Sequence, residues 1–282
     1  MGAPGTGRGR PFWKLCGSGN DFVFFDARSE PAGLLATPAT IRALCARGTG
    51  VGADGVVFLE SPDAGAPAAS VRMAYYNADG SRAAMCGNAA LCTTRLAVEL
   101  GAADPAGMIL ATDVGPMPAV LGADGLPRIE LPPIGALAGD ARHVVAVGTE
   151  RRIGFALAGV PHLVVRVEDV DGVALDARGR VLRHDPALAD GANVNWVSPL
   201  SGGRWRMRTY ERGVEGETLA CGTGAVACAA VLALWDEAGE EVELVTSSGR
   251  SVRVRQPAGA GRGPTLAGEG RIVFNGVLGD LG

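Results

Sequence analysis

Two stretches of this chain share one arrangement, and this repetition constrains the fold more than any other feature of the sequence. The first is AAMCGNAALCTTRLAVELG, from Ala83 to Gly101, and the second is LACGTGAVACAAVLALWDEAG, from Leu219 to Gly239. In each stretch a cysteine is followed by glycine and then by an apolar run that predicts a helix. Cysteine is a poor helix cap, so its presence at both helix starts asks for one common explanation.

The segments before the two cysteines also correspond. A strand is predicted from Val71 and another from Arg204, and a polar turn, NADGSRAAM or ERGVEGETLA, then leads to Cys86 or Cys221. Repeats of this length indicate a duplicated domain, because solenoid repeats have periods of about 20–50 residues. Two lobes related by a pseudo-twofold axis would bring the two cysteines face to face across one cleft.

A cysteine at a helix start has a particular chemistry. The first turn exposes backbone N–H groups without internal partners and carries about half a positive charge. A thiolate there is stabilised, so its pKa falls below ~8.5, and the same N–H groups can bind a carboxylate. With a substrate carboxylate held at both helices, one of Cys86 and Cys221 can remove the α-proton while the other returns a proton to the opposite face. The pattern predicts racemisation or epimerisation by general acid–base catalysis, without a cofactor.

Other uses of the two thiols stay open at this point. They could form a redox pair that cycles through a disulfide, which would make the chain a thiol–disulfide redox protein. A hydrolase-type Cys-His nucleophile is a further hypothesis, since the chain holds His143, His162 and His184. The cysteine spacings, C-x5-C and C-x6-C, do not match those of structural zinc sites, so no metal is expected. Three other cysteines fall within apolar helical patterns and are predicted to be buried: Cys45, Cys92 and Cys228.

Composition and charge exclude several classes of function. The 282 residues suit about two domains, and a net charge of −4 without any basic cluster gives no indication of a nucleic-acid partner. The longest apolar run, Ala225–Trp235, is too short for a membrane span of ~20 residues, and the N-terminus lacks the apolar region of a secretory signal. We therefore expect a cytoplasmic protein with no membrane partner. Lys14 is the only lysine, so a pyridoxal phosphate enzyme would need it for its Schiff base.

Strand patterns dominate both halves. Strands are predicted over residues 21–27, 55–60, 71–76, 143–147, 154–159, 162–169, 193–198, 204–211, 241–248, 251–256 and 270–279. Helices are predicted over residues 37–48, with Thr37 as N-cap, and from about residue 222, whereas residues 61–69 are expected to form a loop. Residues 1–10 are expected to be a flexible extension. The expected N-terminal lobe combines residues 11–128 with 267–282, and the expected C-terminal lobe spans 129–266.

Several motifs, taken together, resemble the diaminopimelate epimerase family. They are GSGNDFVFFD at 17–26, GADG at 52–55, NADGSRAAMCGN at 77–88, GVPH at 159–162, NVN at 193–195 and YERGVEGETLACGTGA at 210–225. They occur in the family's order and cover the chain from about Trp13 onwards. The resemblance implies an α+β fold of two similar lobes related by a pseudo-twofold, each a β-barrel-like sheet wrapped around a central helix. The final strand of such proteins returns to the first lobe.

The resemblance also implies roles for individual residues. It gives Cys86 and Cys221 as the acid–base pair that converts LL- into meso-diaminopimelate, for lysine and peptidoglycan precursors, with no cofactor and no metal. The amides implied to hold the reacting carboxylate are those of Gly87, Asn88, Gly222 and Thr223. The other implied substrate-binding residues are Asn20, Asn77, Asn193, Glu211 and Arg212. Arg212 can bind a distal carboxylate in a fork, and Glu211 can meet an ammonium group. His162 either orients a cysteine or caps a strand.

The chain departs from the family pattern at positions that bear on the substrate. Val160 stands where the family often has asparagine, and Cys16 stands where a histidine is common. Ala89 and Leu91 replace the usual glycine and arginine, and Gly55 lies where some members use glutamine. Asn88 favours the diaminopimelate branch, because proline racemases and hydroxyproline epimerases usually carry histidine after MCG. The alternative within this fold is a racemase or epimerase of another amino acid, of the proline or hydroxyproline type. Whether the protein forms a homodimer stays open at this point.

Overall fold

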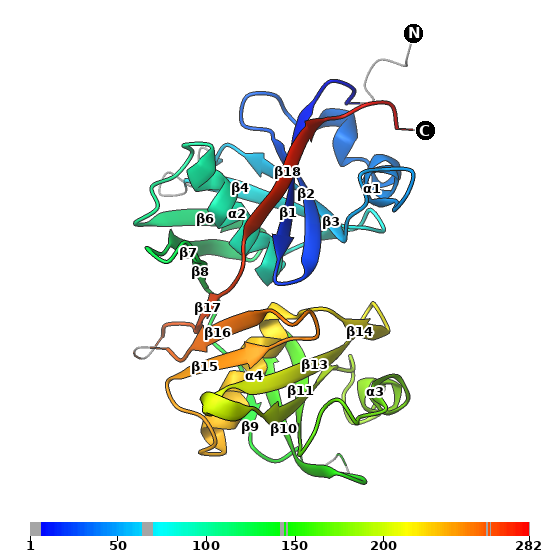
Figure 1. The fold of residues 1–282 in the computed structure, drawn as a ribbon, viewed down its shortest axis with the longest axis vertical. Helices are drawn as coiled ribbons and strands as arrows, with labels where there is room; N and C mark the ends of the chain where they lie inside the picture. Colours follow the sequence, from blue (N-terminus) through cyan, green and yellow to red (C-terminus); the bar gives the residue numbers. More distant parts are fainter. Residues whose placement is uncertain are drawn as a thin grey trace. The chain divides into compact units, whose positions relative to one another are not determined.

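The computed structural model describes residues 7–63, 70–141, 144, 146–257, 259 and 261–281. The chain divides into two units. Unit 1 comprises Met1–Ile129 and Gly268–Gly282, and unit 2 comprises Glu130–Ala267. Figure 1 shows the last segment of the chain, in red, returning to the blue strands of unit 1.

Unit 1 is built on one curved mixed sheet. Its strands run in the order β18, β1, β2, β3, β4, β6, β7, β8, and β5 pairs with β4. The β2–β3 and β4–β6 pairs are parallel and the others are antiparallel. The strands span β1 Pro11–Gly17, β2 Asn20–Asp26, β3 Gly55–Glu60, β4 Val71–Asn77, β5 Arg82–Ala83, β6 Met108–Thr112, β7 Gly115–Leu121, β8 Pro127–Glu130 and β18 Arg271–Val277.

Unit 2 repeats this topology strand for strand. Its order is β9, β10, β11, β12, β13, β15, β16, β17, with β14 on β13. Again two pairs are parallel, β11–β12 and β13–β15, and they occupy the places of the two parallel pairs of unit 1. The strands span β9 Leu137–Ala138, β10 Glu150–Ala158, β11 Val160–Val167, β12 Asn193–Pro199, β13 Trp205–Glu211, β14 Gly216–Thr218, β15 Glu241–Val245, β16 Ser251–Arg255 and β17 Thr265–Ala267.

Each sheet encloses one long apolar helix. In unit 1, α2 (Gly87–Glu99) contacts β1, β3, β4, β7 and β18, and in unit 2, α4 (Gly222–Leu234) contacts β9, β10, β11, β12, β15 and β16. Ten residues of α4 are buried, nearly all of them small or aliphatic, because the helix has sheet around most of its surface. The predicted α+β fold of two similar lobes, each a sheet around a central helix, is confirmed.

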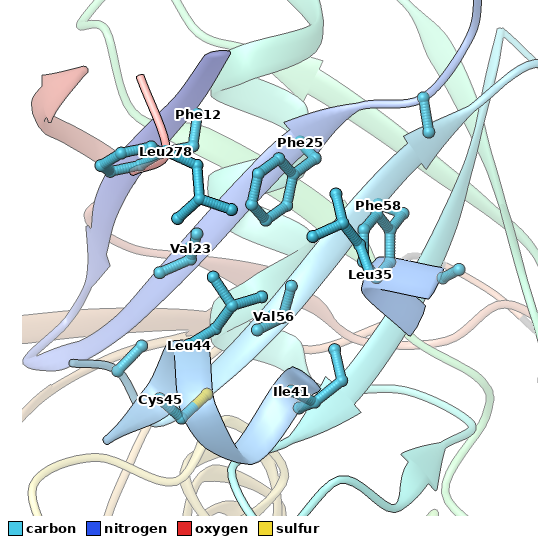
Figure 2. Packing of buried hydrophobic residues seen from close by; sticks show 13 residues of the cluster. Phe12, Val23, Phe25, Leu35, Ile41, Leu44, Cys45, Val56, Phe58 and Leu278 are labelled. Atoms are coloured by element: carbon cyan, nitrogen blue, oxygen red, sulfur yellow. The ribbon is translucent and has the colours of Figure 1, made fainter. Parts of the chain in front are cut away.

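A shorter helix covers the outer face of each sheet. In unit 1, α1 (Pro38–Cys45) and the 3-10 turn η1 (Gly33–Ala36) pack on alternate residues of β2 and β3, as Figure 2 shows for Val23, Phe25, Val56 and Phe58. In unit 2, α3 (Leu175–Arg183) packs on residues of β11, β12 and β13. Since side chains alternate along a strand, the residues between these face the central helix.

The prediction from sequence missed α3, because its sequence, LDARGRVLR, has a glycine in the middle. Gly179 is needed there for packing: a Cβ on it would lie 2.6 Å from the Tyr210 ring of β13. Glycine lowers helix propensity by about 1 kcal/mol relative to alanine, which hides the helix from sequence patterns. The strand predicted over 143–147 is wrong at residues 144, 146 and 147, which lie in no strand, while residues 143 and 145 lie outside the described part.

The remaining predicted elements agree closely with the structure. Thr37 caps α1, its Oγ1 accepting from the Thr40 amide at 3.3 Å, although the helix ends at Cys45. Of the predicted loop over 61–69, residues 64–69 lie outside the described part. The same holds for residues 1–6 of the predicted extension, whereas Arg10 is buried and donates to the Glu30 carbonyl at 2.8 Å.

Within the described residues, no helix is long and apolar enough to cross a membrane.

Candidate active site

The first cysteine site lies where α2 begins in unit 1. Cys86 is the N-cap residue, with an extended backbone (φ −139°, ψ 122°), and its side chain is half-buried. The first hydrogen bond of the helix runs from the Ala90 amide to the Cys86 carbonyl at 2.9 Å. The amide of Gly87 therefore lies in the first turn without an acceptor inside the helix, as expected for an anion-binding helix start.

Asn20 joins this helix start to the sheet. The Asn88 side-chain amide donates to Asn20 Oδ1 at 2.8 Å, and Asn20 Nδ2 donates to Asp54 at 3.1 Å. Asn77 ends β4 and donates to Ser81 Oγ at 3.0 Å, within the turn that leads towards Cys86. The structure thus brings Asn20 and Asn88 together at α2, and it places Asn77 on the polar turn before the cysteine.

The strand turn that presents Asn20 is held by a charged cluster. Lys14 is buried, forms an ion pair with Asp21 at 2.7 Å and also donates to the Gly52 carbonyl. Arg47 binds the same carboxylate from the other side at 2.7 Å. Burial raises the pKa of Asp21, but hydrogen bonds from Arg47 and Lys14 outweigh this effect, so the pKa lies below its usual value.

This cluster makes unit 1 sensitive to acid. Because the pKa of Asp21 is lower in the folded chain, its stabilising effect is complete above the unfolded pKa of about 3.9 and is lost as the pH falls through the folded pKa. We expect Asp21→Asn to lower the free energy of unfolding at neutral pH and to flatten its decline below about pH 4. Urea denaturation over this pH range measures both. The exposed Glu240→Gln is the control, and an unchanged acid limb in Asp21→Asn would contradict the assignment.

The second cysteine site has the same backbone geometry in unit 2. Cys221 is the N-cap of α4 (φ −128°, ψ 109°), and the Ala225 amide donates to its carbonyl at 2.9 Å. The amide of Gly222 is again in the first turn, without an acceptor inside the helix. The Cys221 sulfur lies 3.6 Å from Thr223 Oγ1, within hydrogen-bond reach for sulfur. The side chain of Cys221 is buried, more so than that of Cys86.

Predicted substrate-binding residues gather at the end of β13. The Arg212 amide donates to Asn193 Oδ1 at 2.7 Å, which fixes the Asn193 side chain at the start of β12. Glu211 accepts from Thr218 Oγ1 at 2.7 Å, and the Arg212 guanidinium reaches the Asp190 carbonyl at 3.3 Å. The structure therefore brings Asn193, Glu211 and Arg212 together in unit 2, where β13 ends and the loop to β14 begins.

His162 lies fully buried in β11, directly beside Asn193 of β12 in the parallel register. Its Nδ1 lies 3.2 Å from Asn195 Nδ2, and Asn195 in turn accepts from Thr209 Oγ1 at 2.9 Å. Burial, together with a smaller effect of the nearby charge of Arg212, lowers the pKa of His162 to about 3, so the ring is uncharged at neutral pH. Asn195 and Thr209 were not predicted as site residues. The one signal for Asn195 is a second asparagine in NVN, on an otherwise apolar strand.

Comparison with known proteins shows the family to which the chain belongs. The model of the diaminopimelate epimerase family matches residues 12–129 and 155–261, which include both cysteines. The chain belongs to the diaminopimelate epimerase family. A member from Gemmatimonas aurantiaca is 49% identical over 96% of this chain and 99% of its own length. Another, from Aquifex aeolicus, is 42% identical over 78% of this chain and 80% of its own.

Solved structures extend the likeness at the level of the fold. A hydroxyproline epimerase from Agrobacterium vitis superposes with a TM-score of 0.68 at 18% identity, covering 95% of this chain and 90% of that one. The family membership makes this chain an amino-acid epimerase, an isomerase. Among the residues described, no group of three or more His, Cys, Asp or Glu side chains is arranged to hold a metal ion.

Three of the other four cysteines are packed into the cores of this family member, whereas Cys16 is half-buried. Cys92 and Cys228 are fully buried on the two central helices, and Cys45 is buried on α1, as predicted. Burial raises the pKa of Cys45 to about 11 and those of Cys92 and Cys228 well above the usual thiol value. These three sulfurs therefore remain thiols at neutral pH and act as small apolar side chains.

Proposed function

We propose that this chain interconverts LL- and meso-diaminopimelate by proton transfer between Cys86 and Cys221, supplying precursors of lysine and peptidoglycan. The observation that carries the proposal is that two helices at matching places in two units of identical topology both begin at a cysteine. Membership of the diaminopimelate epimerase family along most of the chain supports the choice of substrate.

The reaction needs only the two sulfurs and the helix starts. A thiolate on one face removes the α-hydrogen, so that a C–H bond breaks and an S–H bond forms. The thiol on the other face then gives its proton to the α-carbon, which inverts the centre and exchanges the protonation states of the two sulfurs. As negative charge moves onto the carboxylate, the amides of Gly87 and Gly222 and the two helix dipoles stabilise it. This scheme requires both cysteine sites to act on one bound substrate.

The distal end of the substrate is an amino acid as well, and charged residues of unit 2 suit it. Arg212 can bind the distal carboxylate with two N–H donors, and Glu211 can accept from the distal ammonium. Asn20 and Asn77, at the first cysteine site, and Asn193, at the second, provide further amide groups. Val160 begins β11 where the family often has asparagine, so the distal contact at that position is apolar in this chain.

Isotope exchange tests this function directly. We expect the reduced protein to incorporate deuterium at the α-carbon when LL-diaminopimelate is incubated in heavy water, with meso-diaminopimelate as the product. Mass spectrometry follows the label, and chiral chromatography follows the product. Exchange with proline or another amino acid, and none with diaminopimelate, would replace the proposed substrate. If no amino acid exchanged while the two thiols formed a readily cycled disulfide, the chain would be a redox protein instead.

A further inference from the structure

Four polar side chains of unit 1 form a hydrogen-bond network that ends at the first turn of α2. The Arg47 guanidinium pairs with Asp54 Oδ1 at 2.8 Å, and Asp54 Oδ2 accepts from Asn20 Nδ2 at 3.1 Å. Asn20 Oδ1 in turn accepts from the side-chain amide of Asn88 at 2.8 Å. Asn88 is the second residue of α2, two positions after Cys86. The network therefore links the residue before β3 to the helix start that presents the first cysteine.

Asp54 determines how the amide of Asn20 is oriented. As the ion-pair partner of Arg47 it is a carboxylate, which can only accept, so the atom of Asn20 that faces it must be Nδ2. Oδ1 of Asn20 then lies on the other side, where it accepts from Asn88. Asp54 is held in its own place by Asp21, whose amide donates to Asp54 Oδ2 at 3.2 Å and whose carbonyl accepts from the Asp54 amide at 2.8 Å.

The far end of the network is buried against β1. Asn88 is 3% exposed, and a Cβ on Gly17, the last residue of β1, would lie 2.7 Å from the Asn88 carbonyl oxygen. The first turn of α2 therefore lies in close contact with the sheet. A side-chain amide buried there needs an acceptor, because a buried donor without a partner is unfavourable. Asn20 provides that acceptor.

The topology shared by both units does not require this network, because unit 2 lacks it. By strand register and by position in the helix, the residues that correspond to Asn20, Asp54 and Asn88 are Val160, Ala192 and Thr223. Two of these three have apolar side chains and cannot form the hydrogen bonds. The hydroxyl of Thr223 lies instead 3.6 Å from the Cys221 sulfur. The network thus has a role in unit 1 that the fold alone does not explain.

We propose that Asp54 is a positioning residue for Cys86, acting through the two asparagines of the network on the first turn of α2. The Cys86 carbonyl accepts the first hydrogen bond of the helix, from the Ala90 amide, so a first turn that loosens moves the cysteine with it. The free N–H groups of that turn stabilise a thiolate or a bound carboxylate only while they keep their direction. This inference rests on the proposed function of the first cysteine site.

Hydrogen exchange tests the positioning without any substrate. Asp54→Ala removes the carboxylate and introduces the residue that unit 2 has at the corresponding position. We expect the Ala90 amide to exchange about 10-fold faster in this variant, while the Leu96 amide further along α2 keeps its rate. Exchange followed by NMR measures both amides. An unchanged rate at Ala90, or an equal increase at both amides, would overturn the proposal whatever the substrate of the enzyme.

Kinetics of two Asp54 variants separate its role as an acceptor from its charge. In Asp54→Asn the side-chain carbonyl can still accept from Asn20, and only the ion pair with Arg47 is lost, so kcat should stay within about twofold. Asp54→Ala should lower kcat about 10-fold with a smaller change in KM, which is the rate equivalent of one hydrogen bond to a charged group. Asp54→Ser, one atom shorter, replaces the alanine variant if that does not fold. Equal losses in Asp54→Asn and Asp54→Ala, or an effect on KM alone, would contradict the positioning role.

The matched control is Asp124→Ala, in the turn between β7 and β8. Asp124 resembles Asp54 in exposure, 40% against 37%, pairs with Arg128 at 2.6 Å and accepts from the Leu126 amide at 3.1 Å. These partners belong to the same hairpin, so the variant should leave both the exchange at Ala90 and kcat unchanged. A fall in kcat as large as that of Asp54→Ala would show that kcat follows the stability of unit 1, and the proposal would be refuted.

Discussion

Replacing Cys86 or Cys221 with alanine abolishes epimerisation, with an expected loss in kcat of about 10⁴-fold or more, at the upper end for a general acid or base. Each variant keeps one sulfur and can deprotonate or protonate only one face of the α-carbon. Inversion needs both faces, so both variants fail in both directions of the reaction. Product formation from LL- and from meso-diaminopimelate measures this loss for each variant separately.

The chain contains a matched control for this experiment. Cys228→Ala makes the same chemical change on the same helix as Cys221, at a fully buried thiol whose pKa burial raises. Its kcat should stay close to that of the unchanged protein, with some loss of stability from the small cavity. Full activity in Cys86→Ala or in Cys221→Ala would refute the two-base scheme, since no second sulfur would then be needed.

Replacing Gly224 with alanine is expected to lower kcat by about 100-fold, because a misplacement of about 1 Å at a reacting group has an effect of this size. The added Cβ would meet Asn195 Oδ1 at 2.4 Å and Met207 at 3.1 Å, so the first turn of α4 must move away from the sheet. Cys221 caps that turn and moves with it. Alanine favours a helix over glycine by about 1 kcal/mol, so the helix itself should not be weakened.

The control for this variant is Gly216→Ala in β14. A Cβ there would meet nothing within 4 Å, and the residue is not in the left-handed region of the backbone. Its kcat and thermal midpoint should both be unchanged. A Gly224→Ala protein with the kcat of the unchanged enzyme would mean that the sulfur does not depend on the close approach of α4 to the sheet.

Much of the fold could be predicted because its signals are local. The glycine and apolar run after Cys86 and after Cys221 mark the starts of α2 and α4, and β3 was predicted to the residue. Elements whose sequence contains a residue that disfavours them were missed. The helix α3 is interrupted in sequence by Gly179, whose role is to let Tyr210 approach, and that contact depends on tertiary packing.

The candidate site was predictable in part: the residues of the sequence motifs could be identified, but the residues that pack around them could not. The cysteines and the asparagines of the motifs stand out in the sequence, but the hydrogen bond between Asn20 and Asn88 appears only in the structure. Asn195 does not stand out, because a polar residue on a strand can equally face solvent. Only the register of β11, β12 and β13 shows that His162, Asn195 and Thr209 lie side by side on the face towards α4.

The pairing of β18 with β1 has a consequence for how the protein is made. Pro11 and Val277 are register partners at one end of this ladder, so a strand near the start of the chain pairs with one near its end. A ribosome releases the whole of unit 2 before the segment that completes the sheet of unit 1 emerges. The sheet of unit 1 therefore stays incomplete, with one edge of β1 unpaired, until the end of synthesis. Unit 2 can fold as soon as its own residues have been synthesised.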